Sequence, residues 1–139
     1  MKPNLFLVLS SLSFLAPAIT CYNSRYYGLS GIYVLVTTVS SVYHVTKNPS
    51  LVYLDYSLSQ LAHLLTVHRI LKGGWASMPA YSLWLSYAIF IYYYGYLTKT
   101  LVWNPDLDAA TPWHMTLHVS TAATTSYTVW ATFNHLRKA

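Results

Sequence analysis

Long apolar stretches separated by short polar breaks make up most of the chain. The breaks carry residues that commonly end helices, such as Asn48-Pro49 and Gly73-Gly74. Each apolar stretch is close to the roughly 20 mostly apolar residues that a helix needs to cross a bilayer. The pattern therefore predicts one all-α domain over residues 1–139, a polytopic transmembrane bundle of about five helices. The expected helices cover about residues 4–20, 28–46, 51–71, 80–98 and 112–134.

Two Xaa-Pro pairs predict where helices begin. Asn48 before Pro49 and Thr111 before Pro112 match an N-cap followed by proline in the first helical turn. Proline is tolerated there because the N–H that it lacks would have no partner inside the helix. We therefore expect the third and fifth helices to begin at these pairs.

The first apolar stretch has an alternative interpretation. Lys2, the apolar run from Leu5 to Leu15 and the small residues Ala16-Pro17-Ala18 are also typical of a cleaved secretory signal peptide. A single lysine makes a weak basic region, so we expect a retained helix and keep the signal peptide as the alternative.

Composition agrees with a membrane bundle. Only 8% of the residues are charged and 55% are hydrophobic, whereas about a quarter of the residues of a soluble domain are charged. The net charge of +5 comes from eight Lys and Arg against three Asp, with no Glu. These cations lie singly near helix ends, so we expect interface anchors and no nucleic-acid partner. The single cysteine, Cys21, excludes an internal disulfide.

The distribution of Lys and Arg predicts an orientation, because the cytoplasmic side of a membrane protein carries more of them. Three basic residues fall on the side of the N-terminus and five on the other side. They are Lys2, Lys47 and Lys99 against Arg25, Arg69, Lys72, Arg137 and Lys138. We therefore expect a cytoplasmic C-terminus and an exoplasmic or lumenal N-terminus.

Five polar residues within the expected helices are candidates for chemistry, because ionisable groups inside a membrane are costly and commonly functional. Ser40 and His44 lie near the end of the second helix, Asp55 near the start of the third, and His114 and His118 near the start of the fifth. In an up-and-down bundle these three helix ends lie on the same membrane side. The five side chains are therefore expected to meet at a similar depth.

The spacing of these residues favours a metal site. Residues four apart share one helix face, as His114 and His118 do. Two such histidines and a third from another helix, His44, provide the three protein ligands of a catalytic zinc site. Asp55 is placed to orient a ligand or take a proton, and Ser40 to bond water or an oxyanion. The alternative is that these are hydrogen-bonded packing residues of the bundle.

The same residues resemble a known signature. Ser40-Ser41-Val42-Tyr43-His44, then Asp55, then His114-Met115-Thr116-Leu117-His118 are similar to the pattern of the membrane hydrolase superfamily that contains the alkaline ceramidases and the adiponectin and progestin receptors. The resemblance implies Zn²⁺ held by His44, His114 and His118, with Asp55 and Ser40 positioning or deprotonating its water. The short His-to-Asp spacing is most similar to the alkaline ceramidase branch, which implies a membrane lipid amide as substrate.

Two features depart from that superfamily. Its members typically have seven helices, with three between the Asp helix and the last one, and only the 80–98 segment fills this interval here. Alkaline ceramidases also have an acidic calcium-binding stretch before the first helix, and Met1-Lys2-Pro3-Asn4 has no acidic residue. Removing two helices keeps the direction of the last helix, so the metal site can still form, but ceramide specificity is much less secure.

Three functions are therefore compared. The leading hypothesis is a zinc-dependent amide hydrolase acting on a membrane lipid. The second is a non-enzymatic receptor-like or accessory membrane protein with a structural metal site. Haem binding ranks last, because the adjacent His114 and His118 suit one metal ion better than a haem.

Other polar residues are assigned no catalytic role. We expect His63 to form an interhelical hydrogen bond, with substrate binding as the alternative. Asp106 and Asp108 are expected to be solvated loop acids, with cation binding as the alternative. Ala122, Ala123 and Thr124 below His118 predict either close helix packing or a slot for an acyl chain.

Overall fold

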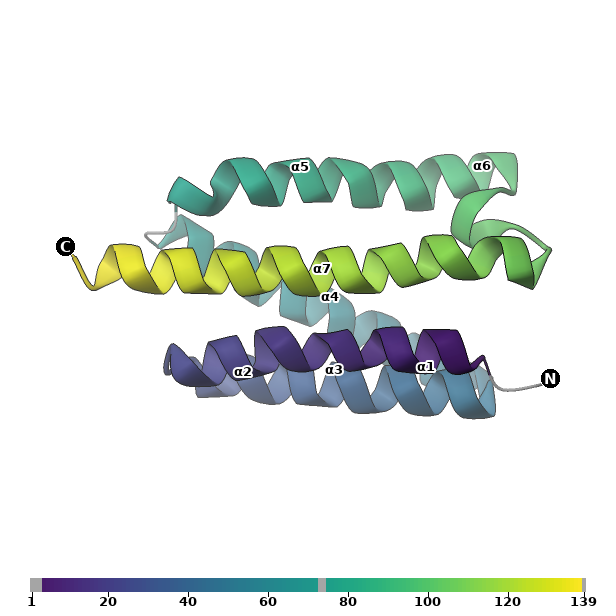
Figure 1. Ribbon diagram of the computed structural model, residues 1–139, viewed down its shortest axis with the longest axis horizontal. Helices are drawn as coiled ribbons and strands as arrows, with labels where there is room; N and C mark the ends of the chain where they lie inside the picture. Colours follow the sequence, from purple (N-terminus) through teal and green to yellow (C-terminus); the bar gives the residue numbers. More distant parts are fainter. Residues whose placement is uncertain (1–3, 73–74, 139) are drawn as a thin grey trace.

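The computed structural model describes residues 4–72 and 75–138, and these residues form helices and no strand. The helices assemble into five rods that run alternately up and down (Figure 1). Their elements are α1 (Leu5–Ser11), η1 (Leu12–Phe14), α2 (Leu15–Asn23), α3 (Tyr27–Thr46), α4 (Pro49–Leu71), η2 (Trp75–Ser77), α5 (Met78–Ile89), η3 (Phe90–Tyr94), α6 (Gly95–Thr98), η4 (Leu101–Trp103) and α7 (Leu107–Leu136). The expected all-α class and the five helices are confirmed. Lys2 and the Gly73-Gly74 break lie outside the described residues.

The first rod joins α1, η1 and α2 into one continuous helical segment. Its central 3-10 turn precedes Pro17, which lacks the amide that would bond to the carbonyl of Ser13. The rod packs against both α3 and α7. Phe14, Ala18 and Cys21 enter the main hydrophobic core, so this apolar segment is an integral part of the bundle.

The start of the third rod is as predicted. The Asn48 side chain accepts a hydrogen bond from the Ser50 amide at 3.0 Å, and Pro49 occupies the first turn of α4. Just before it, Lys47 adopts a left-handed conformation with φ of 54° and ends α3. This two-residue connection makes α3 and α4 neighbours.

The predicted start of the last helix is wrong. Asp106, not Thr111, caps α7 and accepts a hydrogen bond from the Asp108 amide at 3.0 Å. Pro112 therefore lies inside the helix. Because proline has no N–H, one backbone hydrogen bond is missing near the start of the helix. The helix continues on both sides of Pro112. As a result, His114 lies about two turns into α7 rather than in its first turn.

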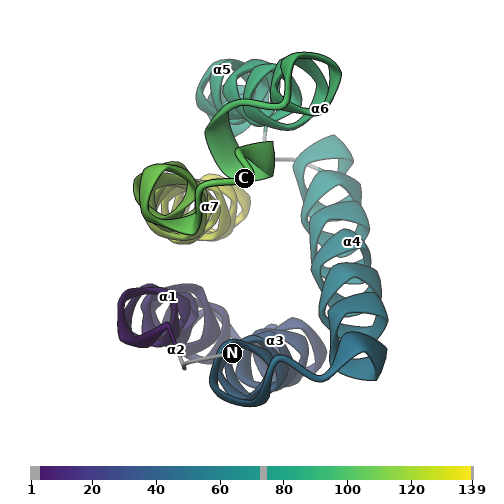
Figure 2. The same cartoon turned by 90° about the vertical axis from the view of Figure 1, so that its right-hand side faces the viewer.

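The rods form a ring around a central space (Figure 2). Going round the ring, the first rod is followed by α3, α4, the α5–α6 rod and α7. The buried residues include almost as many polar as hydrophobic side chains, while leucines such as Leu64 and Leu83 are exposed on the outside. So large a share of polar side chains in the interior departs from the usual pattern of a soluble domain.

Two of the described helical segments are long and apolar enough to cross a membrane, Leu5–Asn23 and Tyr27–Thr46. The other described helices do not meet the same criteria of length and hydropathy. The two segments are compatible with a membrane location, while the multi-pass arrangement and its orientation stay predictions.

The turn between the fourth and fifth rods depends on Gly95. A Cβ added at Gly95 would lie 2.8 Å from the backbone carbonyl oxygen of Thr100, which no side-chain rotation can relieve. We expect Gly95→Ala to lower the free energy of unfolding by about 1–3 kcal/mol. Gly31→Ala is the matched control, because Gly31 is also helical and a Cβ there meets nothing within 4 Å. Thermal unfolding in detergent tests this, and equal stability of the two variants would contradict it.

Candidate metal centre

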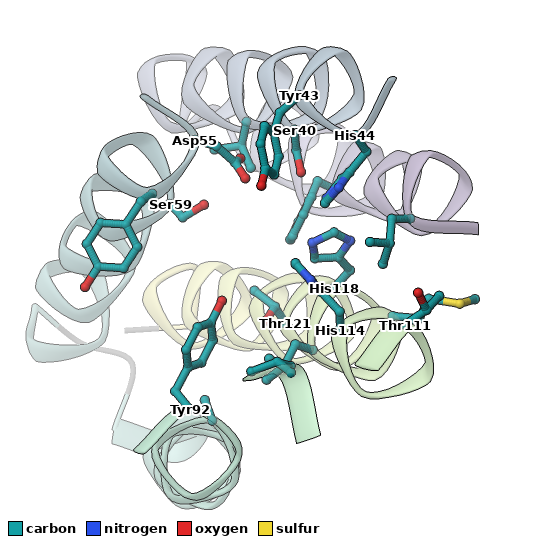
Figure 3. A pocket seen from close by; sticks show the side chains of 18 of the residues that line it. Ser40, Tyr43, His44, Asp55, Ser59, Tyr92, Thr111, His114, His118 and Thr121 are labelled. Atoms are coloured by element: carbon teal, nitrogen blue, oxygen red, sulfur yellow. The ribbon is translucent and has the colours of Figure 1, made fainter. Parts of the chain in front are cut away.

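Three histidines from two helices converge at one point near one end of the bundle (Figure 3). His44 lies in the last turn of α3, and His114 and His118 lie one turn apart on α7. One nitrogen from each ring lies within 4.8 Å of the other two. The predicted convergence of these three side chains is therefore confirmed.

The geometry of the three rings suits a single metal ion. The ring centroid of His44 lies 5.2 Å from that of His114 and 5.6 Å from that of His118, and the centroids of the two α7 rings are 4.7 Å apart. Around one tetrahedral zinc the ligand nitrogens lie about 3.3 Å apart. The 4.8 Å spread is slightly wider, so a small closing movement of the imidazoles brings them to ligand distance.

His44 provides the observation that tests whether a metal fits. Its side chain is 1% exposed, and neither ring nitrogen has a hydrogen-bond partner among the described residues. A buried polar group without a partner costs about 1–3 kcal/mol. A metal ion shared with His114 and His118 would satisfy one of these nitrogens, so the residues present fit a metal site. Their chemistry does not by itself decide which metal.

Ser10 on α1 orients His118. Its hydroxyl donates to the carbonyl of Leu7 at 3.0 Å and lies 2.9 Å from Nδ1 of His118. A serine hydroxyl has only one hydrogen, so with that hydrogen on Leu7 it can only accept from His118. Nδ1 therefore carries the hydrogen, which leaves Nε2 as the metal ligand. This is the usual arrangement, in which an outer hydrogen bond sets the tautomer of a ligand histidine.

The neighbouring Ser11 connects α1 to the other predicted polar residues. Its hydroxyl lies 3.0 Å from that of Ser40, and Ser40 in turn interacts with the carboxylate of Asp55. Asp55 lies in α4, and its carboxyl group points toward the space next to the histidines (Figure 3). Ser40 and Asp55 are thus brought to the same end of the bundle as the three histidines.

A cavity of about 1560 Å³ extends from this point into the bundle. Metal-site residues and apolar side chains of α5 both line it, including Leu85, Ala88 and Ile89. Tyr92, from the π-helical segment η3, points into it from the side opposite Ser40 (Figure 3). Segments of π-helix are frequent at functional sites.

Two interpretations were open for the small residues after His118, and the structure favours close packing over an acyl slot. Ala122 packs in the hydrophobic core, and neither it nor Ala123 or Thr124 lines the cavity. The helix period explains this, because the residue of α7 that follows His118 on the cavity side is Thr121. The apolar wall is provided by α5 instead.

His63 behaves as expected and also borders the cavity. Its Nδ1 lies 3.3 Å from the hydroxyl of Tyr81, and its ring packs on Trp84 with centroids 4.8 Å apart. The interhelical hydrogen bond is therefore confirmed. His63 does not belong to the histidine cluster.

The N-terminal end of the first rod closes the bundle above the histidines. The Asn4 side-chain amide donates to Thr111 on α7 at 2.7 Å, and its backbone amide donates to the carbonyl of His44 at 3.3 Å. Lys47 also lines this end of the cavity, and partial burial lowers the pKa of its ammonium group below the usual value. Asp108 borders the same end from the first turn of α7 rather than from a loop.

No protein-family model, no curated protein and no solved structure matches this chain. The resemblance to the membrane hydrolase superfamily therefore rests on five residues and their order. Ser10 and Ser11 were missed by the sequence analysis, although a Ser-Ser pair within an apolar run was a visible signal. A hydroxyl in such a run commonly bonds to its own backbone, as both of these also do.

Removal of the third ligand, His44, tests the metal site. Replacing His44 by Ala leaves two ligands from one helix turn. Loss of a group that only hydrogen-bonds to a ligand lowers metal affinity about 10–100-fold. We expect loss of the ligand His44 itself to lower zinc affinity by more than that. His63→Ala is the matched control, because His63 lines the same cavity but lies outside the cluster. Chelator competition on purified protein measures both, and equal zinc affinities would contradict the assignment.

Substitutions at Ser10 test whether its hydroxyl orients His118. Ser10→Ala removes the acceptor for Nδ1 of His118, so zinc affinity should fall about 10–100-fold. Ser10→Thr keeps the hydroxyl and should restore the affinity. Ser11→Ala, which removes a hydroxyl directed at Ser40 rather than at a histidine, should leave the affinity unchanged. An unaltered affinity in Ser10→Ala would show that the hydrogen bond does not orient a ligand.

Proposed function

We propose that this protein is a zinc-dependent intramembrane hydrolase that cleaves the amide bond of a membrane lipid. The observation that supports it best is the convergence of His44, His114 and His118 at the end of a large, partly apolar cavity. Asp55 and Ser40 border the same cavity. Together they form the donor set of a catalytic zinc site with a carboxylate beside it.

A multi-pass membrane location is part of the proposal. It is supported by the two apolar helical segments and by the exposed leucines on the outside of the other rods. The interior serines and threonines bond largely to their own helix backbones, as Thr37 does to Tyr33 and Thr66 to Ala62. We place the C-terminus in the cytoplasm and the N-terminus in the exoplasm or lumen, from the distribution of Lys and Arg.

The proposed reaction assigns a role to each polar side chain. Zinc, when bound, lowers the pKa of a coordinated water and polarises a carbonyl group. Asp55 accepts a proton from the attacking water and delivers it to the amine that leaves. The Ser40 hydroxyl holds the Asp55 carboxylate in place or donates to the oxyanion that develops on the acyl carbon. Water and the amide are thereby converted into a carboxylic acid and an amine.

The shape of the cavity supports a lipid as substrate. Its polar end carries the histidines and Asp55, while Leu85, Ala88 and Ile89 of α5 form an apolar wall farther along. An acyl chain would lie against this wall with its polar linkage at the histidines. The choice of an amide over another carbonyl linkage rests on the resemblance to the alkaline ceramidases.

The second candidate function is a receptor-like or accessory protein in which the metal is a structural clamp. The closed environment of His44, whose ring nitrogens have no exposed surface, favours this alternative. A clamp would stabilise the contact between α3 and α7 without turnover. Haem binding fits the site poorly, because three imidazoles at one point leave no room for a porphyrin plane between them.

Asp55 separates an enzyme from a clamp. Asp55→Asn keeps the size of the side chain but removes the base. We expect zinc binding to persist and hydrolysis of a long-chain fatty acyl amide to fall by about 10²–10⁴-fold.

Asp108→Asn is the matched control, since Asp108 also borders the cavity but lies apart from Ser40 in the first turn of α7. It should retain activity. Full turnover by Asp55→Asn would show that the carboxylate is not the base. Absence of turnover in the zinc-loaded parent protein across acyl amides would favour the clamp.

A further inference from the structure

The end of the bundle opposite the histidines carries a concentration of positive charge. The chain has three Asp and no Glu, and all three Asp lie at the histidine end, in or near the start of α4 and α7. The cations at the opposite end are Arg25, Arg69, Lys72, Arg137 and Lys138. The sequence indicated single interface anchors, and no Asp or Glu side chain lies at this end among the described residues to pair with any of them.

Two of these cations share one hollow. A pocket of about 470 Å³ lies between the turn that joins α2 to α3 and the last turns of α4. Arg25 lines it from the turn, and His68 and Arg69 line it from α4. Two arginines and a histidine therefore line one space from two different elements. Guanidinium groups bind phosphate through paired, charge-assisted hydrogen bonds.

Backbone and ring contacts hold the two arginines in place. The turn is closed by hydrogen bonds from the Arg25 amide to Tyr22 at 2.9 Å and from the Tyr26 amide to Cys21 at 2.8 Å. Arg25 itself adopts a left-handed conformation with φ of 62°. The guanidinium of Arg69 lies 4.5 Å above the ring of Tyr26, so its position is fixed before any ligand binds.

The same aromatic contact brings a third arginine near. The ring of Tyr26 meets that of Phe133 edge-on at 6.4 Å, and the guanidinium of Arg137 lies over Phe133 at 5.6 Å. Arg69 and Arg137 are thus connected through two rings, and Arg25 precedes Tyr26 in the turn, without an intervening Asp or Glu. Their mutual repulsion falls when an anion binds between or beside them.

The pocket also has an apolar side, which distinguishes a lipid from a free anion. Leu29 and Leu65 line it together with the cations. Next to it, Tyr22 and Tyr27 form an edge-to-face pair at 5.4 Å and are both exposed, as is typical of aromatic residues at a membrane interface. A phosphate held by the arginines would therefore place a glycerol backbone and acyl chains against leucine and tyrosine.

We propose that this pocket binds the phosphate group of an anionic phospholipid at the membrane face opposite the metal centre. Basic pockets between transmembrane helices bind lipid head groups in this way. The inference rests on the membrane insertion proposed above and is independent of the zinc chemistry. Because the site lies at the far end of α3 and α4 from His44 and Asp55, its loss should leave zinc content unchanged.

The test uses the full chain in detergent, with lipid binding measured by native mass spectrometry. The probes are phosphatidic acid, phosphatidylcholine with the same acyl chains, and inorganic phosphate. We expect the parent protein to bind phosphatidic acid in preference to the other two. In Arg25→Gln/Arg69→Gln, the dissociation constant for phosphatidic acid should rise about 30-fold, the effect of removing two cations near a membrane surface.

Lys72→Gln/Lys138→Gln is the matched control, because it removes the same charge from the same end without touching the pocket. It should bind phosphatidic acid as the parent does. An equal loss in the control would show diffuse electrostatic attraction and overturn the proposal. So would equal binding of phosphatidic acid and phosphatidylcholine by the parent, or equal binding of phosphatidic acid and inorganic phosphate.

Two further measurements keep the result independent of folding and of the metal centre. Arg69→Lys keeps the charge but loses the planar guanidinium, so its affinity should fall between the parent and the double variant. Zinc content should match the parent in every variant. A well-folded Arg25→Gln single variant with the parent's affinity would exclude the turn residue as a ligand and overturn the site as drawn.

Discussion

The need to satisfy buried imidazole nitrogens constrains the whole histidine end of this bundle. His44 is almost completely buried, and neither nitrogen of its ring has a hydrogen-bond partner among the described residues. Without a shared ion, both nitrogens of the buried His44 ring are left without a partner. One metal ion would satisfy one of them and tie α3 to α7. The first rod contributes by packing against both helices and by fixing the tautomer of His118 through Ser10.

The two ends of the bundle differ in charge. Every Asp lies at the histidine end, where Asp55 borders the cavity and Asp106 caps α7. The opposite end has only cations, and two of them line a second pocket. The predicted orientation, which was drawn from these same cations, places this end at the cytoplasmic leaflet, where anionic lipids are concentrated. In this account one end carries the chemistry and the other holds the protein to its membrane.

The residues that were predicted correctly are those with a local or periodic signal. The spacing of His114 and His118 follows from the helix period, and Asn48-Pro49 marks a helix start through backbone chemistry alone. Thr111-Pro112 gave the same local signal, but Asp106 offered a competing cap five residues earlier and the helix extended through the proline. Local signals could not decide between the two caps, because each could satisfy the free amides of a helix that begins directly after it.

The residues that were missed depend on contacts between distant segments. Ser10 acquires its role only when α1 lies beside His118, a residue 108 positions away. The small residues after His118 left close packing and an acyl slot both open, and only the rotation of α7, which turns Ala122 into the core, decides between them. Likewise, the sequence indicates that Arg25 and Arg69 are separate anchors, and they line one pocket only because the α2–α3 turn lies beside the end of α4.

Zinc-edge X-ray absorption of the purified protein tests the central claim most directly, because it reports the ligands of the metal without a substrate. The account predicts about one zinc per chain with three nitrogen ligands at about 2.0–2.1 Å and one oxygen ligand. Protein that is folded yet takes up no zinc, or zinc whose ligands are not predominantly imidazole nitrogens, would contradict it.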